Sequence, residues 1–306
     1  MKHSTPLSRA QGLTLVELMV SLALSLVIVI AATSFYVGSS RSRDTLDDSA
    51  QLQDNARFAT DVITKAIQQA GYQNYVAGSA GASTRREVAA ASDGEPDLRG
   101  YNNTAAGVGI DNGDHGRNAN RVNNSDTLVL RYQGAGTPAD GSIIDCLGRP
   151  QAAPMLPGDR AYSIFEIRQP AGATEPELRC KYYNSSGSGT FSSEPIVRGV
   201  ETLQLMYGVA TTSDSTINRW LNASEVSPTG STTLLADWEK VRAVRVGMVL
   251  RSPNRVAVTP AAATSTLKPL GDNFSQNVND NLVVNNADGR LRKVVTFTVN
   301  IRNILQ

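Results

Sequence analysis

The sequence has few of the residues on which most enzyme and metal sites depend. Its 306 residues include two histidines and two cysteines, and aromatic residues make up 6%. No P-loop, G-x-G-x-x-G or G-x-S-x-G pattern occurs. Charge is balanced, with 29 lysines and arginines against 28 aspartates and glutamates. These absences favour a protein that is not an enzyme and give no global electrostatic attraction to nucleic acid.

Two patterns resemble functional sites without meeting their full requirements. Ser265-Thr266-Leu267-Lys268 fits S-x-x-K, but a companion K-T-G is missing and the segment is rich in Thr, Pro and Ala. His115 lies near Asp111, Asp114 and Asp126 in an oxygen-rich stretch of the kind that binds calcium. The spacing matches no EF-hand, and Asn/Asp/Gly stretches usually form turns. We therefore expect no catalytic residue, no metal and no cofactor.

A long uncharged run near the N-terminus is the strongest signal. No charged side chain occurs from Leu18 to Ser40. A helix of this length, at about 1.5 Å per residue, crosses a hydrocarbon core of about 30 Å. Glu17 lies at the start of the run, where a carboxylate near lipid costs on the order of a few kcal/mol unless it is paired or interfacial. A simple anchor does not need this carboxylate, so Glu17 is expected to contact another molecule.

Two simpler interpretations compete with this one. A secretory signal peptide would use Lys2 and Arg9 as its basic start and Ala32-Thr33-Ser34 as its cleavage site. The second simpler interpretation is a plain membrane anchor with a single span. The length of the run and the position of Glu17 disfavour both. Lys2 and Arg9 favour a cytoplasmic N-terminus, although Arg41 and Arg43 weaken the asymmetry.

The segment Gly12-Leu13-Thr14-Leu15-Val16-Glu17-Leu18 resembles the class III signal of type IV pilins and type II secretion pseudopilins. The resemblance implies that prepilin peptidase cuts between Gly12 and Leu13 and methylates the new N-terminus at Leu13. Leu13 replaces the phenylalanine that is usual at this place. Glu17 becomes the fifth mature residue, which the family links to subunit assembly.

Physical chemistry gives Glu17 a role consistent with that resemblance. Cleavage leaves a positively charged amine on Leu13. The Glu17 carboxylate can pair with the amine of a neighbouring subunit when the helices pack together. Such a buried pair favours one stagger between subunits, as a buried polar group does in a coiled coil.

Helical periodicity continues beyond the apolar run. Its apolar stripe recurs every three or four residues and comprises Ala59, Val62, Ile63, Ala66, Ile67 and Ala70. Gly71 is a suitable helix stop. We predict one helix over 13–70, with a kink or fraying at 38–40, or alternatively two helices. The predicted organisation is a cleaved leader (1–12), a transmembrane assembly helix (13–37), its amphipathic continuation (38–71) and a periplasmic β-rich head (72–306).

Several segments of the head alternate like strands. The predicted strands are 126–132, 161–167, 178–183, 202–207, 244–251 and 294–302. Residues 78–125 are predicted to be loop, and long polar connections are expected over 208–233 and 252–290. One long helix packed on an antiparallel sheet is an α+β, type IV pilin-like fold.

The resemblance extends to the PilW group of minor pilins. It rests on 55–59, 70–72, 199–204, 207–208, 238–246, 250–252 and 298–303, while 73–125 carries none of it. A buried sheet of any other family would also show much of this alternation of apolar residues. Trp238 is interpreted as a core anchor rather than a binding-site aromatic.

Cys146 and Cys180 both lie in the part expected outside the membrane. In an oxidising periplasm two lone cysteines favour a disulfide, and two buried thiols are the alternative.

The resemblance implies a minor pilin that helps to prime pilus assembly near the tip, supporting twitching motility, adhesion or DNA uptake. Its implied partners are other minor pilins, the major pilin and prepilin peptidase, with a single span of the bacterial inner membrane before assembly into the surface fibre. No direct nucleic-acid site is evident. The alternatives are a type II secretion minor pseudopilin and a membrane-anchored surface adhesin.

Overall fold

The computed structural model describes residues 14–73, 95–103, 122–153, 160–184, 190–211, 216–228, 231–256, 264–274 and 280–303. Its first element is α1, a helix of 55 residues over Leu15–Gln69. α1 continues through Gly38 without a break, so the alternative of two helices is wrong. Gly71 follows the helix with a φ of 72°, and its N–H donates to the carbonyl of Arg131. This left-handed glycine ends the helix as the sequence predicts.

The described chain divides into two compact units at Asp47 and Asp48. The first unit consists of the N-terminal part of α1. The second contains the rest of α1 and both main sheets. Within it, α1 buries one residue every three or four positions, at Asp48, Leu52, Ala56, Ala59, Ile63, Ala66 and Ile67. This spacing is that of a helix with one face against a core.

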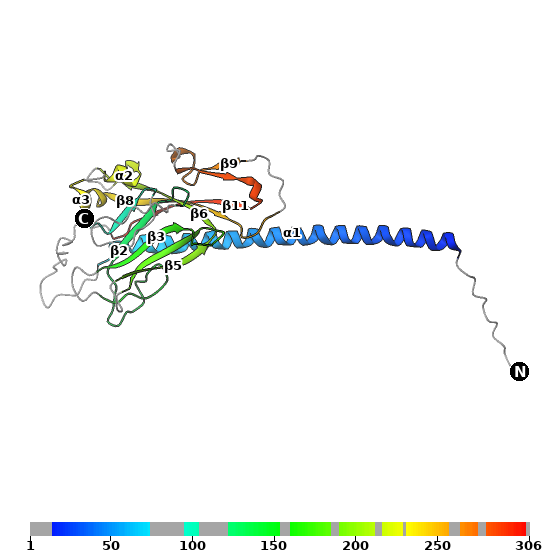
Figure 1. Ribbon diagram of the computed structural model, residues 1–306. Helices are drawn as coiled ribbons and strands as arrows, with labels where there is room; N and C mark the ends of the chain where they lie inside the picture. Colours follow the sequence, from blue (N-terminus) through cyan, green and yellow to red (C-terminus); the bar gives the residue numbers. More distant parts are fainter. Residues whose placement is uncertain are drawn as a thin grey trace. The chain divides into compact units, whose positions relative to one another are not determined.

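A five-stranded antiparallel sheet has the order β1-β2-β3-β4-β5. Figure 1 labels β2, β3 and β5 of this sheet. Its strands are β1 (Leu98–Tyr101), β2 (Thr127–Tyr132), β3 (Ala161–Arg168), β4 (Glu177–Asn184) and β5 (Thr190–Arg198). One face contributes Leu128, Phe165 and Leu178 to the core that also holds the buried stripe of α1.

A four-stranded antiparallel sheet has the order β11-β8-β6-β7. Its strands are β6 (Val200–Val209), β7 (Arg219–Leu221), β8 (Val241–Arg251) and β11 (Arg292–Asn300). A separate ribbon pairs β9 (Thr264–Leu267) with β10 (Leu282–Asn285). The short helices are α2 (Ala223–Val226), α3 (Leu234–Trp238), η1 (Asp272–Phe274) and η3 (Asn286–Asp288). The same core extends through this second sheet by way of Leu203, Val246 and Met248.

A polar segment, Asn123–Asp126, joins the two sheets. The Asp126 N–H donates to Leu203 O at 2.8 Å, and its carboxylate accepts the N–H groups of Leu205 (2.8 Å) and Asn103 (2.9 Å). Asn123 donates its side-chain amide to Glu201 O at 2.8 Å. Burial raises the pKa of Asp126 to about 8. The sheets are therefore linked at this point by a backbone hydrogen bond together with side-chain hydrogen bonds, rather than by a continuous strand ladder.

A buried ion cluster lies at the start of β6, at the same end as these contacts. Both carboxylate oxygens of Glu201 accept from Arg292, at 2.7 and 3.1 Å. Arg251 lies 3.5 Å from the same carboxylate, and Asp288 pairs with Arg292. The side chains of Glu201, Arg292 and Arg251 are only 7, 10 and 13% exposed. This cluster ties β6, β8 and β11 together.

The predicted α+β architecture is confirmed, and six of its strands were predicted. Three expectations about connections are wrong. β1 lies within the stretch 78–125 that was predicted to be loop. The connection 208–233 contains β7 and α2, and the connection 252–290 contains β9 and β10. Trp238 is 4% exposed and packs edge-on against Tyr207 with ring centroids 4.8 Å apart, as expected for a core anchor.

Candidate assembly interface

The N-terminal part of α1 exposes its large apolar side chains. Leu15 is 76% exposed and Leu18 51%. The other exposed members of this segment are Val16, Met19, Val20, Leu22, Leu24, Leu26, Val27, Ile28, Val29, Ile30, Phe35, Tyr36 and Val37. α1 is long and apolar enough to cross a membrane by length and composition. A water-soluble helix would hide such residues, so this segment fits lipid or a bundle of similar helices.

The hydroxyl groups within this segment bond to their own helix. Ser21 donates to Leu18 O at 2.9 Å, Thr33 to Val29 O at 2.5 Å and Ser34 to Ile30 O at 2.8 Å. Ser25 donates to the carbonyl of Ser21. Because each hydroxyl is satisfied internally, none requires water or a partner helix.

Thr14 caps the start of α1. Its Oγ1 accepts the N–H of Glu17 at 3.3 Å, and its carbonyl accepts the N–H of Leu18 at 3.1 Å. Glu17 thus lies in the first turn, where the positive end of the helix dipole favours a carboxylate. Within residues 14–73, the Glu17 carboxylate has no hydrogen bond or ion pair, so it is available to a partner. Gly12 and Leu13, the expected cleavage and methylation positions, lie outside the described residues.

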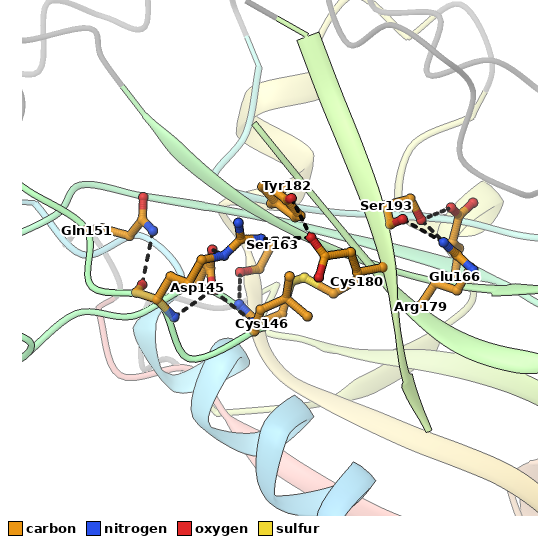
Figure 2. The surroundings of a disulfide bond; sticks show 12 residues. Asp145, Cys146, Gln151, Ser163, Glu166, Arg179, Cys180, Tyr182 and Ser193 are labelled. Atoms are coloured by element: carbon orange, nitrogen blue, oxygen red, sulfur yellow. Dashed lines mark hydrogen bonds and ion pairs between the residues drawn. A yellow bond between two sulfur atoms is a disulfide. The ribbon is translucent and has the colours of Figure 1, made fainter. Parts of the chain in front are cut away.

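The two cysteines form a disulfide, with Cα atoms 5.8 Å apart (Figure 2). Cys180 lies on β4, and Cys146 lies on the connection between β2 and β3. The Cys146 N–H donates to Ser163 Oγ at 3.0 Å, and Ser163 also bonds the hydroxyl of Tyr132 at 2.7 Å. The connection is held at a second point, where Ile144 N–H donates to Gln69 Oε1 of α1 at 3.0 Å.

Charged residues lie beside this disulfide. Asp145 accepts the N–H groups of Leu147 (2.8 Å) and Arg149 (2.9 Å) and pairs with the Arg149 guanidinium at 3.2 Å. That guanidinium lies 3.5 Å from the ring centroid of Tyr182, whose hydroxyl donates to Glu194 at 2.7 Å. The connection is therefore fixed in place against both α1 and β5.

A pocket of about 320 Å³ lies between α1, the disulfide connection and β5. α1 contributes Phe58 and Val62, the connection contributes Leu147, and β5 contributes Pro195 and Ile196. Phe58 is 54% exposed, which is unusual for a phenylalanine of the second unit. The pocket adds an apolar hollow beside the exposed face of α1.

Of the two weaker sequence patterns, one does not form a site and the other lies mostly outside the described residues. Ser265 donates to Asn286 Oδ1 at 3.2 Å, while Lys268 pairs with Asp272 at 2.9 Å, so S-x-x-K is not a nucleophile and base pair. Asp126 binds backbone N–H groups between the sheets and is not an exposed cation ligand. Asp111, Asp114 and His115 lie outside the described residues.

Comparisons with known proteins agree with this geometry. Residues 7–33 match the family model described as the prokaryotic N-terminal methylation motif. Residues 164–303 match the model described as Type IV Pilus-assembly protein W. Together the two matches support a type IV pilus minor pilin of the PilW kind. The first match covers the start of the uncharged segment, and the second covers most of β3 and all of β4 to β11.

Among solved structures, the pilin is similar to a type IV-like pilin from Thermus thermophilus. The two are 16% identical with a TM-score of 0.41, over 83% of this chain and 98% of that chain. No curated protein matches the sequence significantly. The pilin family is structural and non-enzymatic, and its prepilin motif implies peptidase cleavage and assembly with other pilins.

Sequence reasoning found Glu17 and the two cysteines but missed the pocket beside Phe58. Phe58 follows Arg57 and precedes a buried alanine, so its helical position alone indicates that it points away from the core. The other walls come from 144–148 and β5, which are far away in sequence, and no periodicity links them to α1.

Proposed function

We propose that this minor pilin enters the fibre through α1, with the Glu17 carboxylate pairing with the N-terminal amine of a neighbouring subunit. Prepilin peptidase cuts between Gly12 and Leu13 and methylates Leu13. The head lies in the periplasm before assembly and on the fibre surface afterwards. The observation that carries the proposal is the first-turn carboxylate of Glu17, which has no partner among the described residues and lies at the start of an exposed, uncharged helical segment.

In the assembled fibre the pilin works with other minor pilins and the major pilin. It helps to prime assembly and lies near the tip, where the fibre supports twitching motility, adhesion or DNA uptake. The size of the second unit supports a low-copy position, because a head of this size with long connections would crowd a repeating wall. The family description, which names pilus assembly, favours this role over type II secretion.

Substitution at Glu17 tests the pairing. Glu17→Gln keeps the shape of the side chain and removes its charge, so processing should continue while incorporation into sheared fibres falls roughly ten-fold or more, because a buried amine loses its partner. Thr14→Ala is the matched control. It removes the helix cap beside Glu17 but leaves the carboxylate, and incorporation should stay near the unsubstituted level.

Mass spectrometry of the mature N-terminus accompanies the fibre measurement. Methylated Leu13 is expected in both variants, and Gly12→Ala should leave the leader attached because the peptidase needs a residue without bulk there. Undiminished incorporation of Glu17→Gln would contradict the pairing. A mature protein that begins at Met1 would contradict the proposed function as a whole.

A further inference from the structure

Strand β11 presents one free backbone edge. It is the terminal strand of the four-stranded sheet, and β8 is its sole strand partner among the described residues. Ile301 N–H donates to Arg242 O, and Ser252 N–H donates to Leu291 O, so odd-numbered residues of β11 form the hydrogen-bonded pairs with β8. In an antiparallel ladder these pairs alternate with non-bonded ones. The N–H and C=O groups of Val294, Thr296, Thr298 and Asn300 therefore point away from the sheet.

The other edges of the described sheets are short or interrupted. β1 has four residues, β7 three, and β9 and β10 four each. β5 has nine residues but contains Pro195 and a register shift opposite Leu178 and Arg179. β11 has nine residues, no proline and an unbroken register with β8. Natural proteins block long edges because open ones bind other strands, so this edge fits a role in binding.

Positive charge brackets the same edge. Residues 240–303 carry ten lysines and arginines but three aspartates and no glutamate. Lys293 lies at one end of β11, and the exposed Arg302 lies just beyond the other. In the described part of the chain neither has an ion pair, unlike Arg292 nearby. At about 3.3 Å per residue, the two positions are about 30 Å apart along the strand.

We propose that the free edge of β11 binds an extended strand of a neighbouring protein that carries an acidic residue at each end. The strand adds to the four-stranded sheet through the outward groups of Val294 to Asn300. Its terminal carboxylates face Lys293 and Arg302. Main-chain hydrogen bonds supply affinity, and the two charges set the register and exclude cationic strands.

The alternation of outward donors and acceptors favours a strand over a nucleic acid. A polyanion would use the cations but not the backbone carbonyls of the edge, which repel phosphate. The proposal goes beyond incorporation through α1, because it concerns the head and does not depend on Glu17 or on cleavage.

Peptide binding to the full-length protein in detergent tests the proposal. The probe is a synthetic peptide of about ten residues, matching the length of the edge, with alternating threonine and valine between two terminal aspartates. A second peptide has lysines at both ends, and a third probe is single-stranded DNA of similar length. The aspartate peptide should bind roughly ten-fold more tightly than the lysine peptide, by fluorescence anisotropy.

Thr298→Pro removes one outward N–H and leaves every hydrogen bond to β8 intact, since the Thr298 N–H does not face β8. It should abolish binding of the aspartate peptide, whereas the matched Thr298→Ala variant should retain it. Lys293→Glu with Arg302→Glu provides a second test that does not alter the backbone. It should reverse the preference between the two peptides.

Each contrary result has a definite meaning. Equal binding of both peptides, or unchanged binding to Thr298→Pro with a normal melting temperature, would overturn the proposal. Binding of DNA but not of the aspartate peptide would contradict the proposal and show that the ligand of this edge is a polyanion, not a strand. Loss of fibre incorporation in Glu17→Gln would leave these peptide results unaffected, so the two proposals fail separately.

Discussion

Removal of the disulfide should weaken the head by a predictable amount. Cys146 and Cys180 are 34 residues apart in sequence. In the chain-entropy model, closing a loop of this length lowers the entropy of the unfolded chain enough to stabilise the fold by about 4 kcal/mol at 25 °C. Both cysteines are almost fully buried, at 4 and 0% exposure, so Cys146→Ala with Cys180→Ala avoids a buried lone thiol and adds no polar group.

The assay is thermal unfolding of the detergent-solubilised protein, followed by circular dichroism. For a domain of this size, about 4 kcal/mol corresponds to a fall in melting temperature of about 8 °C. Reductant should lower the melting temperature of the unsubstituted protein by a similar amount and leave the double variant unchanged, which is the internal control. An identical melting temperature for both proteins, with and without reductant, would refute the reasoning.

Two further predictions concern buried charge. Glu201→Gln should destabilise the head by about 3 kcal/mol in chemical denaturation, because Arg292 and Arg251 lose the carboxylate that neutralises them; an unchanged denaturation midpoint would argue against the cluster. Asp126 has a folded pKa of about 8 against an ordinary value of 3.8, so its folded form binds a proton more tightly than the unfolded chain. The stability that it contributes is complete below about pH 4 and is lost as the pH rises to about 8. Asp126→Asn should therefore flatten the decline of melting temperature across that window, leaving the smaller slope due to Asp280, whose pKa burial raises to about 6; an equally steep decline in the variant would count against this assignment.

The sequence patterns anticipated elements whose residues alternate or recur locally. The core stripe of α1 and strands β2, β3, β4, β6, β8 and β11 follow from hydrophobic periodicity alone. β5 was missed because Thr190–Arg198 contains two serines, a glutamate and a proline and gains its pairing from β4. β1 was missed because a four-residue strand is too short to show alternation.

The candidate interface was partly predictable for a related reason. Glu17 stands out because a single acid precedes a long uncharged run, a signal that one segment carries by itself. The open edge of β11 depends on the order of strands in the sheet, and the pocket beside Phe58 depends on three distant segments. No local pattern of residues predicts either the open edge or the pocket.

The hydroxyls of Ser21, Ser25, Thr33 and Ser34, which donate to carbonyls of their own helix, affect the free energy of moving α1 between lipid and a bundle of helices. Since these groups satisfy themselves, α1 needs no exchange of polar contacts when it leaves lipid for a bundle of like helices, which is comparably apolar. Under the proposed function, transfer in either direction therefore costs little beyond the pairing of the Glu17 carboxylate with the amine of a neighbouring subunit.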